Sequence, residues 1–390
     1  MSEEKPNVPK LRFPGFADPW EQRKLGEIAH RIIRKNGGNQ SNLPLTISAQ
    51  YGLVDQRDYF NNQVASRDMS GYYLLQNGEF AYNKSTSGDS PWGAVKRLTK
   101  YENGCVSTLY ICFGLDEGDS DFLVTYYETD RWHKEVRMIA AEGARNHGLL
   151  NIAPSDFFET ELTMPAEIEE QAQIGTFFQQ LDSLITLHQR KLDHLKEMKK
   201  GLLQKMFPKN GESIPELRFP GFTDPWEQRK FSDLFSYERP DAYIVNNDEY
   251  DDSNPTPVLT ANKGFILGYT AETRTHEGPC VIFDDFTLDC KLVTFPFMVK
   301  SSAMKILHCH DGVDLTFAYE RLCSAKIEAL GHARHYISVV QNTESAIPSY
   351  EEQSAIGRVL SNLDTLITLH QRKLDHLKQM KKGLLQQMFV

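Results

Sequence analysis

The sequence has no long hydrophobic run and no C-x-x-C cysteine pair. No apolar stretch approaches the roughly 20 residues that a membrane helix needs, and the N-terminus MSEEKPNVPKLRF has no apolar signal region. The 6 cysteines stand at irregular spacings, which suits buried, reduced thiols better than a zinc knuckle or a redox motif. His308-Cys309-His310 has no second ligand pair at a usable spacing. These absences predict a cytoplasmic protein without a metal site.

Catalytic signatures are also missing. The dipeptide Gly-Lys never occurs, which excludes the phosphate loop G-x-x-x-x-G-K-[ST]. There is no G-x-G-x-x-G cofactor loop, no G-x-S-x-G nucleophile turn and no H-x-E…P-C-x-x-C deaminase pattern. Asn-Pro-Pro and Asp-Pro-Pro, which an adenine-methylating active site would carry, are absent. We therefore expect no catalytic residue, and a chain that is not an enzyme by itself.

An excess of positive charge is lacking as well. The chain has 43 Lys and Arg against 53 Asp and Glu, a net charge of −10. A protein that grips DNA unaided usually has the opposite excess. Basic residues gather in segments 181–210 and 351–390, whereas the regions 1–160 and 241–350 are acidic. The composition therefore excludes a lone basic clamp, but not a DNA reader whose partners supply positive charge.

Internal repeats dominate what is present. Residues 11–25 read LRFPGFADPWEQRKL and residues 217–231 read LRFPGFTDPWEQRKF, with 13 of 15 positions identical. Residues 181–207 read LDSLITLHQRKLDHLKEMKKGLLQKMF and residues 363–389 read LDTLITLHQRKLDHLKQMKKGLLQQMF, with 24 of 27 identical. An EEQ motif followed by Ile-Gly precedes each of the latter segments, at residues 169–175 and 351–357. The chain is therefore a duplicated scaffold.

Two inserts that hardly resemble each other lie between the repeats. With 390 residues, the chain exceeds the usual size of one domain. The predicted fold class is α+β, with two mixed α/β domains and two long helices. The predicted parts are a first FPGF box (1–25), a first variable domain (26–160), a central helix (161–210), a second box (211–231), a second variable domain (232–346) and a C-terminal helix (347–390). Residues 78–82 and 280–283 have the composition of strands.

The repeated helix has apolar residues at spacings of three and four, which predicts a packed seam. Its 27 residues from Leu181 to Phe207 span about 40 Å, and two such helices can pair as an antiparallel coiled coil. Polar positions recur unchanged too, which indicates either two copies of one external partner or a recent duplication; the diverged inserts favour the partner. The predicted seam and docking residues are Leu181, Leu184, His188, Arg190, Lys191, Leu192, Leu195, Lys199, Lys200, Leu363, Leu366, His370, Arg372, Lys373, Leu374, Leu377, Lys381 and Lys382.

The order of FPGF box, variable domain, EEQ motif and repeated helix, present twice, resembles the specificity subunit of type I restriction-modification systems. The resemblance implies two target recognition domains, each reading one half of a bipartite double-stranded DNA target. It also implies that the helices form an antiparallel coiled coil, fix the spacer and dock two modification (methyltransferase) subunits. Two restriction (translocase and nuclease) subunits complete such a complex. S-adenosylmethionine, ATP and Mg²⁺ then belong to partner subunits, and this chain binds no cofactor.

Polar loops after the predicted strands are the candidates for DNA contact, because Asn, Arg and Lys read purine edges and Asp accepts from cytosine. For any one of them an ordinary loop or capping role is at least as common. The candidates are Asn83, Lys84, Ser85, Thr86, Ser87, Trp92, Arg145, Asn146, His147, Asp284, Asp285, Thr287, Arg334 and His335. Two alternatives remain at this point: a two-module interaction scaffold unrelated to DNA, which the acidic inserts would suit, and a self-sufficient enzyme.

Overall fold

The protein divides into two compact units. The computed structural model describes residues 7–48, 51–60, 65–88, 90–140, 148–209, 211–260, 264–285, 287–325, 327 and 335–390. Unit 1 consists of residues 1–187 and 373–390, and unit 2 of residues 188–372. Each unit therefore combines one variable domain with parts of both repeated helices. No helix of the described ranges is long and apolar enough to cross a membrane.

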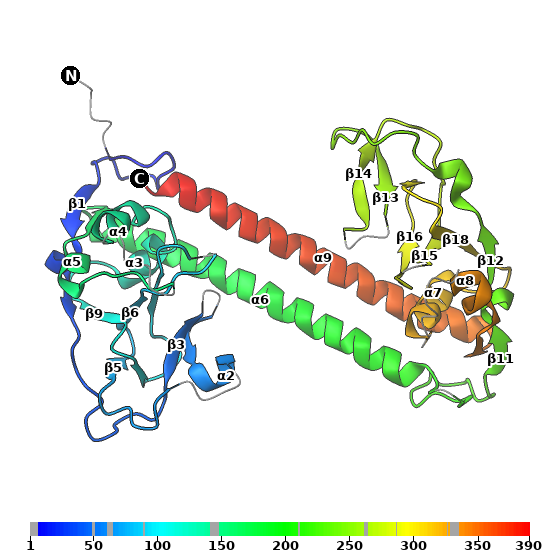
Figure 1. Ribbon diagram of the computed structural model, residues 1–390, viewed down its shortest axis with the longest axis horizontal. Helices are drawn as coiled ribbons and strands as arrows, with labels where there is room; N and C mark the ends of the chain where they lie inside the picture. Colours follow the sequence, from blue (N-terminus) through cyan, green and yellow to red (C-terminus); the bar gives the residue numbers. More distant parts are fainter. Residues whose placement is uncertain are drawn as a thin grey trace. The chain divides into compact units, whose positions relative to one another are not determined.

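Two long helices pass through both units (Figure 1). They are α6 (Ile168–Met206) and α9 (Tyr350–Met388), each with 39 residues. Both carry two glutamates in the first turn, where the positive end of the helix dipole favours them. A short strand, at 161–164 or 344–347, precedes each helix. The helices therefore start later than residues 161 and 347, where the predicted helical segments begin.

Each variable domain has a four-stranded central sheet, and the two sheets have the same arrangement despite the unlike sequences. In unit 1 the strand order is β2-β9-β6-β7, and in unit 2 it is β12-β18-β15-β16, with every neighbouring pair antiparallel. The strands are β2 (Ala29–Arg31), β6 (Phe80–Asn83), β7 (Ala94–Arg97), β9 (Ile111–Leu115), β12 (Phe235–Glu238), β15 (Cys280–Asp284), β16 (Cys290–Val293) and β18 (Met304–Cys309). The strands predicted at 78–82 and 280–283 are thus confirmed as β6 and β15.

Strands from the repeated boxes close each domain. In unit 1 β1 (Glu21–Lys24) pairs antiparallel with β10 (Glu161–Met164), and in unit 2 β11 (Glu227–Lys230) pairs with β19 (Glu344–Ile347). Both edge strands from the boxes have the sequence EQRK. A helix follows the central sheet in each case, α3 (Ser120–Tyr126) in unit 1 and α7 (Leu315–Ser324) in unit 2.

The remaining elements differ between the domains. Unit 1 has two separate two-stranded antiparallel sheets, β3-β4 and β5-β8, whereas unit 2 has a three-stranded sheet of order β14-β13-β17 with a parallel β13–β17 pair. Unit 1 adds α1 (Leu25–Ile28), β3 (Leu45–Ser48), β4 (Gly52–Asp55), α2 (Gln56–Phe60), β5 (Tyr73–Gln76), β8 (Asn103–Val106), α4 (His133–Ile139) and α5 (Pro154–Phe158). Unit 2 adds β13 (Thr256–Leu259), β14 (Ile266–Thr270), β17 (Met298–Val299) and α8 (His335–Ser338).

An aromatic core joins the box, the domain and a helix end in each unit. In unit 1 the Trp20 ring packs edge-on against Phe122 and Phe389, with centroids 5.9 and 5.8 Å apart. In unit 2 Trp226 packs in the same way against Phe317 and Phe207, at 5.8 and 6.3 Å. The first box therefore packs beside the end of α9, and the second beside the end of α6.

The cysteines differ in part from the expectation of reduced thiols. A disulfide joins Cys290 of β16 to Cys323 of α7, whose Cα atoms are 6.2 Å apart. Their separation of 33 residues gave no sign of this proximity. Cys105, Cys112 and Cys280 are buried free thiols, as expected.

Candidate nucleic-acid interface and docking helices

A buried ion pair holds each FPGF box against the start of a long helix. The Arg12 guanidinium donates to both carboxylate oxygens of Glu170 at 2.6 and 2.8 Å, and Arg218 donates to Glu352 at 2.7 and 2.8 Å. Both glutamates are only 1% exposed. Two parallel hydrogen bonds offset the cost of burying such charges. The recurrence of the box arginine and of the second glutamate of EEQ therefore has a structural cause.

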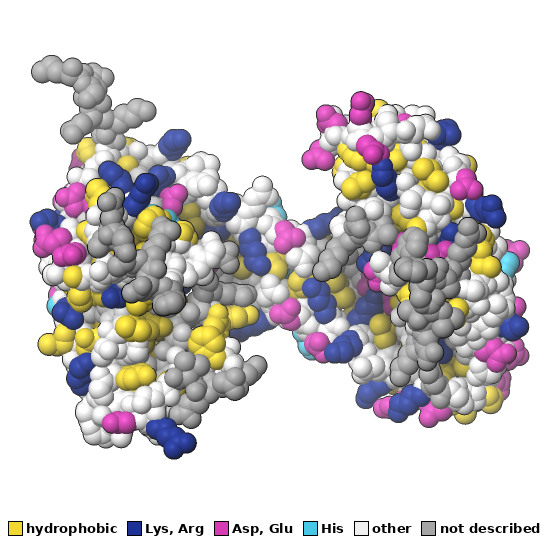
Figure 2. Space-filling view, in the orientation of Figure 1, with side chains coloured by type: hydrophobic (Ala, Val, Ile, Leu, Met, Phe, Trp, Pro, Cys, Tyr) yellow, Lys and Arg dark blue, Asp and Glu magenta, His cyan; other side chains and the backbone are white. Residues whose placement is uncertain are grey.

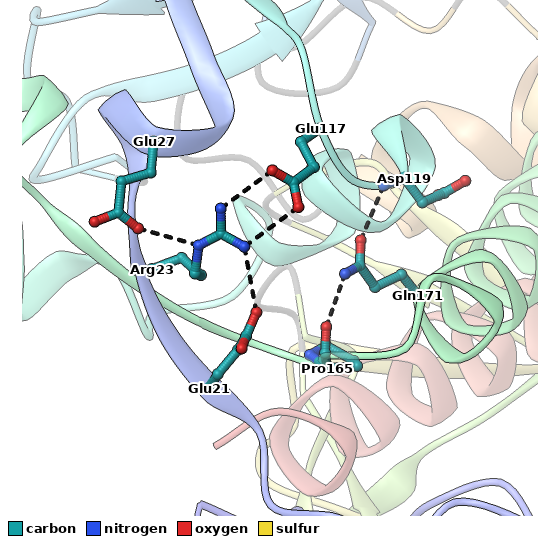
Figure 3. A network of polar contacts seen from close by, with 7 residues as sticks. All are labelled: Glu21, Arg23, Glu27, Glu117, Asp119, Pro165 and Gln171. Atoms are coloured by element: carbon teal, nitrogen blue, oxygen red, sulfur yellow. Dashed lines mark hydrogen bonds and ion pairs between the residues drawn. The ribbon is translucent and has the colours of Figure 1, made fainter.

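The glutamine of EEQ ties the helix to the variable domain. The Gln171 amide accepts from the backbone N–H of Asp119 at 2.9 Å and donates to the carbonyl of Pro165 at 2.7 Å (Figure 3). Gln353 accepts from Asp314 at 3.1 Å and donates to the carbonyl of Pro348 at 2.9 Å. Figure 3 also shows Arg23 of the box among Glu21, Glu27 and Glu117.

The glycine of the Ile-Gly motif lets the helix approach the variable domain closely. A Cβ at Gly175 would lie 2.5 Å from the backbone nitrogen of Phe122, and one at Gly357 would meet the Asp314 carboxylate. Asp119 and Asp314 are N-caps that accept from the backbone N–H groups of Phe122 and Phe317, at 2.8 and 2.9 Å. The sequence comparison missed this Asp-x-x-Phe correspondence because it lies inside the divergent inserts.

One lysine of each repeated helix makes a partly buried three-membered charge cluster. Lys199 pairs with Asp364 at 2.7 Å and with Glu320 of α7, and Lys381 pairs with Asp182 and with Glu128 at 2.6 Å. Burial alone would lower the Lys199 pKa, but the hydrogen bonds that the ammonium group donates to both carboxylates raise it above its ordinary value. These lysines were predicted to dock a partner. That docking role stays a prediction, and within each unit the lysine charges pair with two carboxylates.

The seam between α6 and α9 is antiparallel within each unit. In unit 2 the Nδ1 atoms of His188 and His370 are 3.0 Å apart and Leu192 is 1% exposed, and in unit 1 Leu374 is likewise 1% exposed. In unit 1 the Phe178 and Phe389 rings lie 6.1 Å apart. The buried or partly buried seam residues that were predicted are Leu181, His188, Leu192, Leu195, Leu363, His370, Leu374 and Leu377.

Leu184 and Leu366 correct the predicted seam, because their side chains are 47% and 43% exposed. At about 100° per residue, Leu184 lies roughly 60° around the helix from Leu181, which places it at the border of the seam. It begins a second stripe, of exposed residues, that both helices repeat. This outer stripe consists of Leu184, Leu187, Lys191, His194 and Met198 on α6 and Leu366, Leu369, Lys373, His376 and Met380 on α9. Arg190, Lys200, Arg372 and Lys382 are exposed as well.

The first group of candidate DNA-contact residues forms a loop after β6. The Asn83 side chain accepts from the Ser85 N–H at 3.0 Å, and Thr86 bonds the Gly148 carbonyl through both N–H and hydroxyl, at 2.6 and 3.0 Å. Lys84 reaches the Ile152 carbonyl at 3.3 Å, and burial lowers its pKa. Ser85 and Ser87 are exposed. Trp92 packs partly against the core, and its carbonyl accepts from the Tyr82 hydroxyl.

The other candidates divide into three kinds. Arg145, Asn146, His147 and Arg334 lie outside the described residues, and of His335 only its place at the start of α8 is described. Asp284 and Asp285 are 3% and 4% exposed. Their carboxylates accept from the backbone N–H groups of Thr287 and Tyr336, at 2.7 and 2.9 Å. This burial favours a structural role for both aspartates. Thr287 is exposed.

Acidic side chains gather at the tip of unit 2 around the β13–β14 hairpin (Figure 2). The residues that line a hollow at this tip include Asn247, Asp248, Glu249, Asp251 and Glu272. A surface of this charge repels phosphates, which argues against DNA contact at this tip.

One group of described residues has the composition of a metal site, although the sequence predicted none. The ligand atoms of Glu238, His276 and His308 all lie within 4.8 Å of one another. The Gly278 N–H donates to Nδ1 of His276 at 2.9 Å, so the neutral ring carries its proton on Nε2. Nε2 of His308 lies 2.7 Å from Glu238. These bonds describe a hydrogen-bonded network that joins β12 and β18.

Segments of this chain are similar in sequence to known proteins. Residues 223–379 match the family model of the type I restriction modification DNA specificity domain. A 149-residue segment is 40% identical to the specificity subunit of the Escherichia coli type I restriction enzyme EcoR124I/EcoR124II and covers 34% of this chain and 37% of that protein. A protein of Methanocaldococcus jannaschii, described as the type I restriction enzyme MjaX specificity subunit, is 22% identical over 252 residues, 56% of either chain. The matches thus span about a third to a half of these relatives.

The fold is also shared with a solved structure. The crystal structure of the type I restriction-modification system S subunit from M. genitalium covers 98% of this chain and 99% of its own, with a TM-score of 0.68 at 13% identity. The mixed helix and strand fold is thereby confirmed, and the sequence matches bear out the resemblance to type I specificity subunits over the segments that they cover.

Proposed function

We propose that this chain is the DNA specificity subunit of a type I restriction-modification complex and has no catalytic activity of its own. The match of residues 223–379 to the DNA specificity domain carries the proposal. The shared central sheet supports it for unit 1, because the same frame presents unlike loops in the two units. Each recognition domain would then read one half of a bipartite double-stranded DNA target.

The DNA-reading residues proposed for unit 1 are those of the loop after β6. Ser85 and Ser87 are exposed, and the bonds from Asn83 and Thr86 fix the loop. In unit 2 Thr287 is the exposed counterpart, whereas the buried Asp284 and Asp285 would position its loop. Hydroxyl groups suit phosphate as well as base contacts.

The outer stripes of α6 and α9 are proposed to dock two modification subunits. Each stripe presents leucine, lysine, histidine and methionine in the same order, so one partner surface fits both. The modification subunits would supply S-adenosylmethionine and methylate adenine, and two restriction subunits would add ATP- and Mg²⁺-dependent cleavage. The constant length of α6 and α9 would set the spacer of the target.

Methylome sequencing of a host with and without this chain and its modification subunit tests the proposal. We expect a gapped adenine-methylation motif that depends on the chain. Replacement of residues 26–160 by the corresponding domain of another specificity subunit should change one half of the motif only. An unchanged methylome would overturn the proposal in favour of a two-module scaffold that binds other ligands, which the acidic tip of unit 2 would suit.

A further inference from the structure

Each unit contains a pocket where the end of one long helix meets the variable domain. The pocket of unit 2 has a volume of about 810 Å³ and the pocket of unit 1 about 450 Å³. The helical wall of the unit 2 pocket includes Lys196, Lys199, Lys200 and Leu203. The wall of the unit 1 pocket includes the residues that follow each of these by 182 positions, namely Lys378, Lys381, Lys382 and Leu385.

The opposite helix adds an equivalent residue to each pocket, Ile367 in unit 2 and Ile185 in unit 1. The variable domains add unlike residues, among them Arg321 in unit 2 and Trp132 in unit 1. The shared wall is therefore a combination of lysines with leucine and isoleucine. A ligand that binds both pockets must recognise this combination.

The charge available to a ligand comes from two lysines in each pocket. Lys199 and Lys381 are already paired with carboxylates of their own units. Among the described residues no carboxylate pairs with Lys196, Lys200, Lys378 or Lys382. Two unneutralised ammonium groups beside an apolar floor fit a carboxylate-bearing peptide segment with an aliphatic or aromatic side chain between its acidic residues.

We propose that the two pockets bind the same acidic, apolar segment of the modification subunit, one copy in each unit. The inference rests on the function proposed above and adds a second contact to the outer stripes. A protein segment fits better than a DNA backbone, because phosphates and sugars would leave the leucine and isoleucine wall unfilled. Arg321 and Lys209 add positive charge in unit 2, whereas unit 1 adds one lysine, Lys96, together with the carboxylates of Glu128 and Asp130. The copy at unit 2 is therefore the more tightly bound.

Charge reversal in one pocket at a time tests the proposal. The full chain carrying Lys196→Glu with Lys200→Glu, and the chain carrying Lys378→Glu with Lys382→Glu, would each be mixed with the modification subunit. Native mass spectrometry then counts the bound copies. We expect two copies for the unaltered chain, one for either double variant at concentrations where the unaltered chain is saturated, and none for the quadruple variant. The affinity of the altered end should fall at least tenfold, and the corresponding Lys→Arg variants should retain two copies.

Lys100→Glu with Lys291→Glu, at exposed positions outside both pockets, is the charge-matched control and should keep both copies. Two copies on the quadruple variant would overturn the pocket assignment while leaving the proposed function intact. Retention of both copies with weakened DNA binding would also overturn it and would identify the pockets as phosphate sites. No binding to the unaltered chain would overturn the proposed function together with this inference.

Discussion

The two units use the same contacts at their helix ends and different structures at their tips. The pairs Arg12–Glu170 and Arg218–Glu352, and the clusters around Lys381 and Lys199, recur with nearly equal distances. By contrast, unit 1 adds the pairs β3–β4 and β5–β8 to its central sheet, where unit 2 adds the β14-β13-β17 sheet. Sequence identity between the modules is therefore kept where side chains hold a domain to the helices.

The two divergent regions have less structure in common than the boxes do, but more than their sequences indicate. The central sheets have the same strand order, and an N-cap aspartate followed by a buried phenylalanine opens α3 and α7 alike. A common sheet needs only apolar residues at alternate positions, which many sequences satisfy. The close contact with Gly175 or Gly357 is stricter, so the residues around it are kept.

The largest expected effect follows from removing the buried glutamate of the box contact. Glu352→Ala leaves the partly buried Arg218 guanidinium with only the Asp224 carbonyl as acceptor, and breaking a buried pair of this kind costs about 3–5 kcal/mol. It also removes the acceptor of the Trp226 indole N–H, 3.2 Å away. No acceptor among the described residues faces the indole N–H of Trp20. Glu170→Ala should therefore destabilise unit 1 less than Glu352→Ala destabilises unit 2.

Hydrogen exchange of the full chain measures this difference unit by unit, because amides of β1 and β10 report on unit 1 and those of β11 and β19 on unit 2. Glu351→Ala is the matched control. Glu351 is the exposed neighbour of Glu352, and its replacement should change the free energy of unfolding by less than about 0.5 kcal/mol. Equal loss of protection in the two units would show that the Trp226 hydrogen bond contributes nothing.

The long helices and the strands at 80–83 and 280–284 were predictable from sequence, because repetition, apolar spacing and β-branched composition act locally. The roles of Lys199 and Lys381 were not predictable. Each lysine has two carboxylate partners. The aspartate, Asp364 or Asp182, is part of the visible repeat, but the glutamate, Glu320 or Glu128, stands in a divergent insert. A recurring lysine on a helix therefore looked like a surface for an external partner.

The site residues were harder to predict than the fold. Asp284 and Asp285 stand at the end of a strand, as recognition residues often do, but both carboxylates are buried and accept backbone hydrogen bonds. Leu184 and Leu187 have the composition of a seam, and only the rotation of α6 leaves them exposed. Both differences depend on which face of an element turns inward, which is set by packing between segments far apart in sequence.

An intermediate effect is expected from the close-packed glycines. Gly175→Ala places a methyl group against the backbone of Phe122, which cannot rotate away, so we expect a loss of about 1–3 kcal/mol in unit 1. Gly357→Ala meets the Asp314 side chain, which can turn aside at the loss of one N-cap bond, about 1 kcal/mol.

Gly201→Ala and Gly383→Ala are matched controls within the same helices. A Cβ at either position has no neighbour within 4 Å, and alanine should raise helix stability by up to about 1 kcal/mol. Thermal unfolding of the full chain, combined with exchange at α3 and α7, separates these outcomes. A smaller effect for Gly175→Ala than for Gly357→Ala would contradict the distinction between backbone and side-chain contact.

The smallest expected effect concerns the protonation of the two charge clusters. Burial raises the pKa of Glu320 above its ordinary value of 4.5, and Lys199, shared with Asp364, does not reverse this. Burial acts on Glu128 in the same direction, but Lys381 and Lys96 together hold its pKa below 4.5. On acidification, Glu320 should therefore take up a proton before Glu128 does.

The stability contributions of the two carboxyls have opposite signs with pH. Glu128 stabilises unit 1 at pH values above the unfolded pKa, and this stability is lost as the pH falls through the lower folded pKa. The contribution of Glu320 is complete below the unfolded pKa and is lost as the pH rises through the higher folded pKa. Carboxyl ¹³C shifts of glutamate-labelled chain, assigned with Glu128→Gln and Glu320→Gln, follow both titrations. Lys96→Met should raise the Glu128 pKa toward that of Glu320. If Glu320 instead titrates at a lower pH than Glu128 in the unaltered chain, the assignment of the pKa difference to Lys96 is refuted.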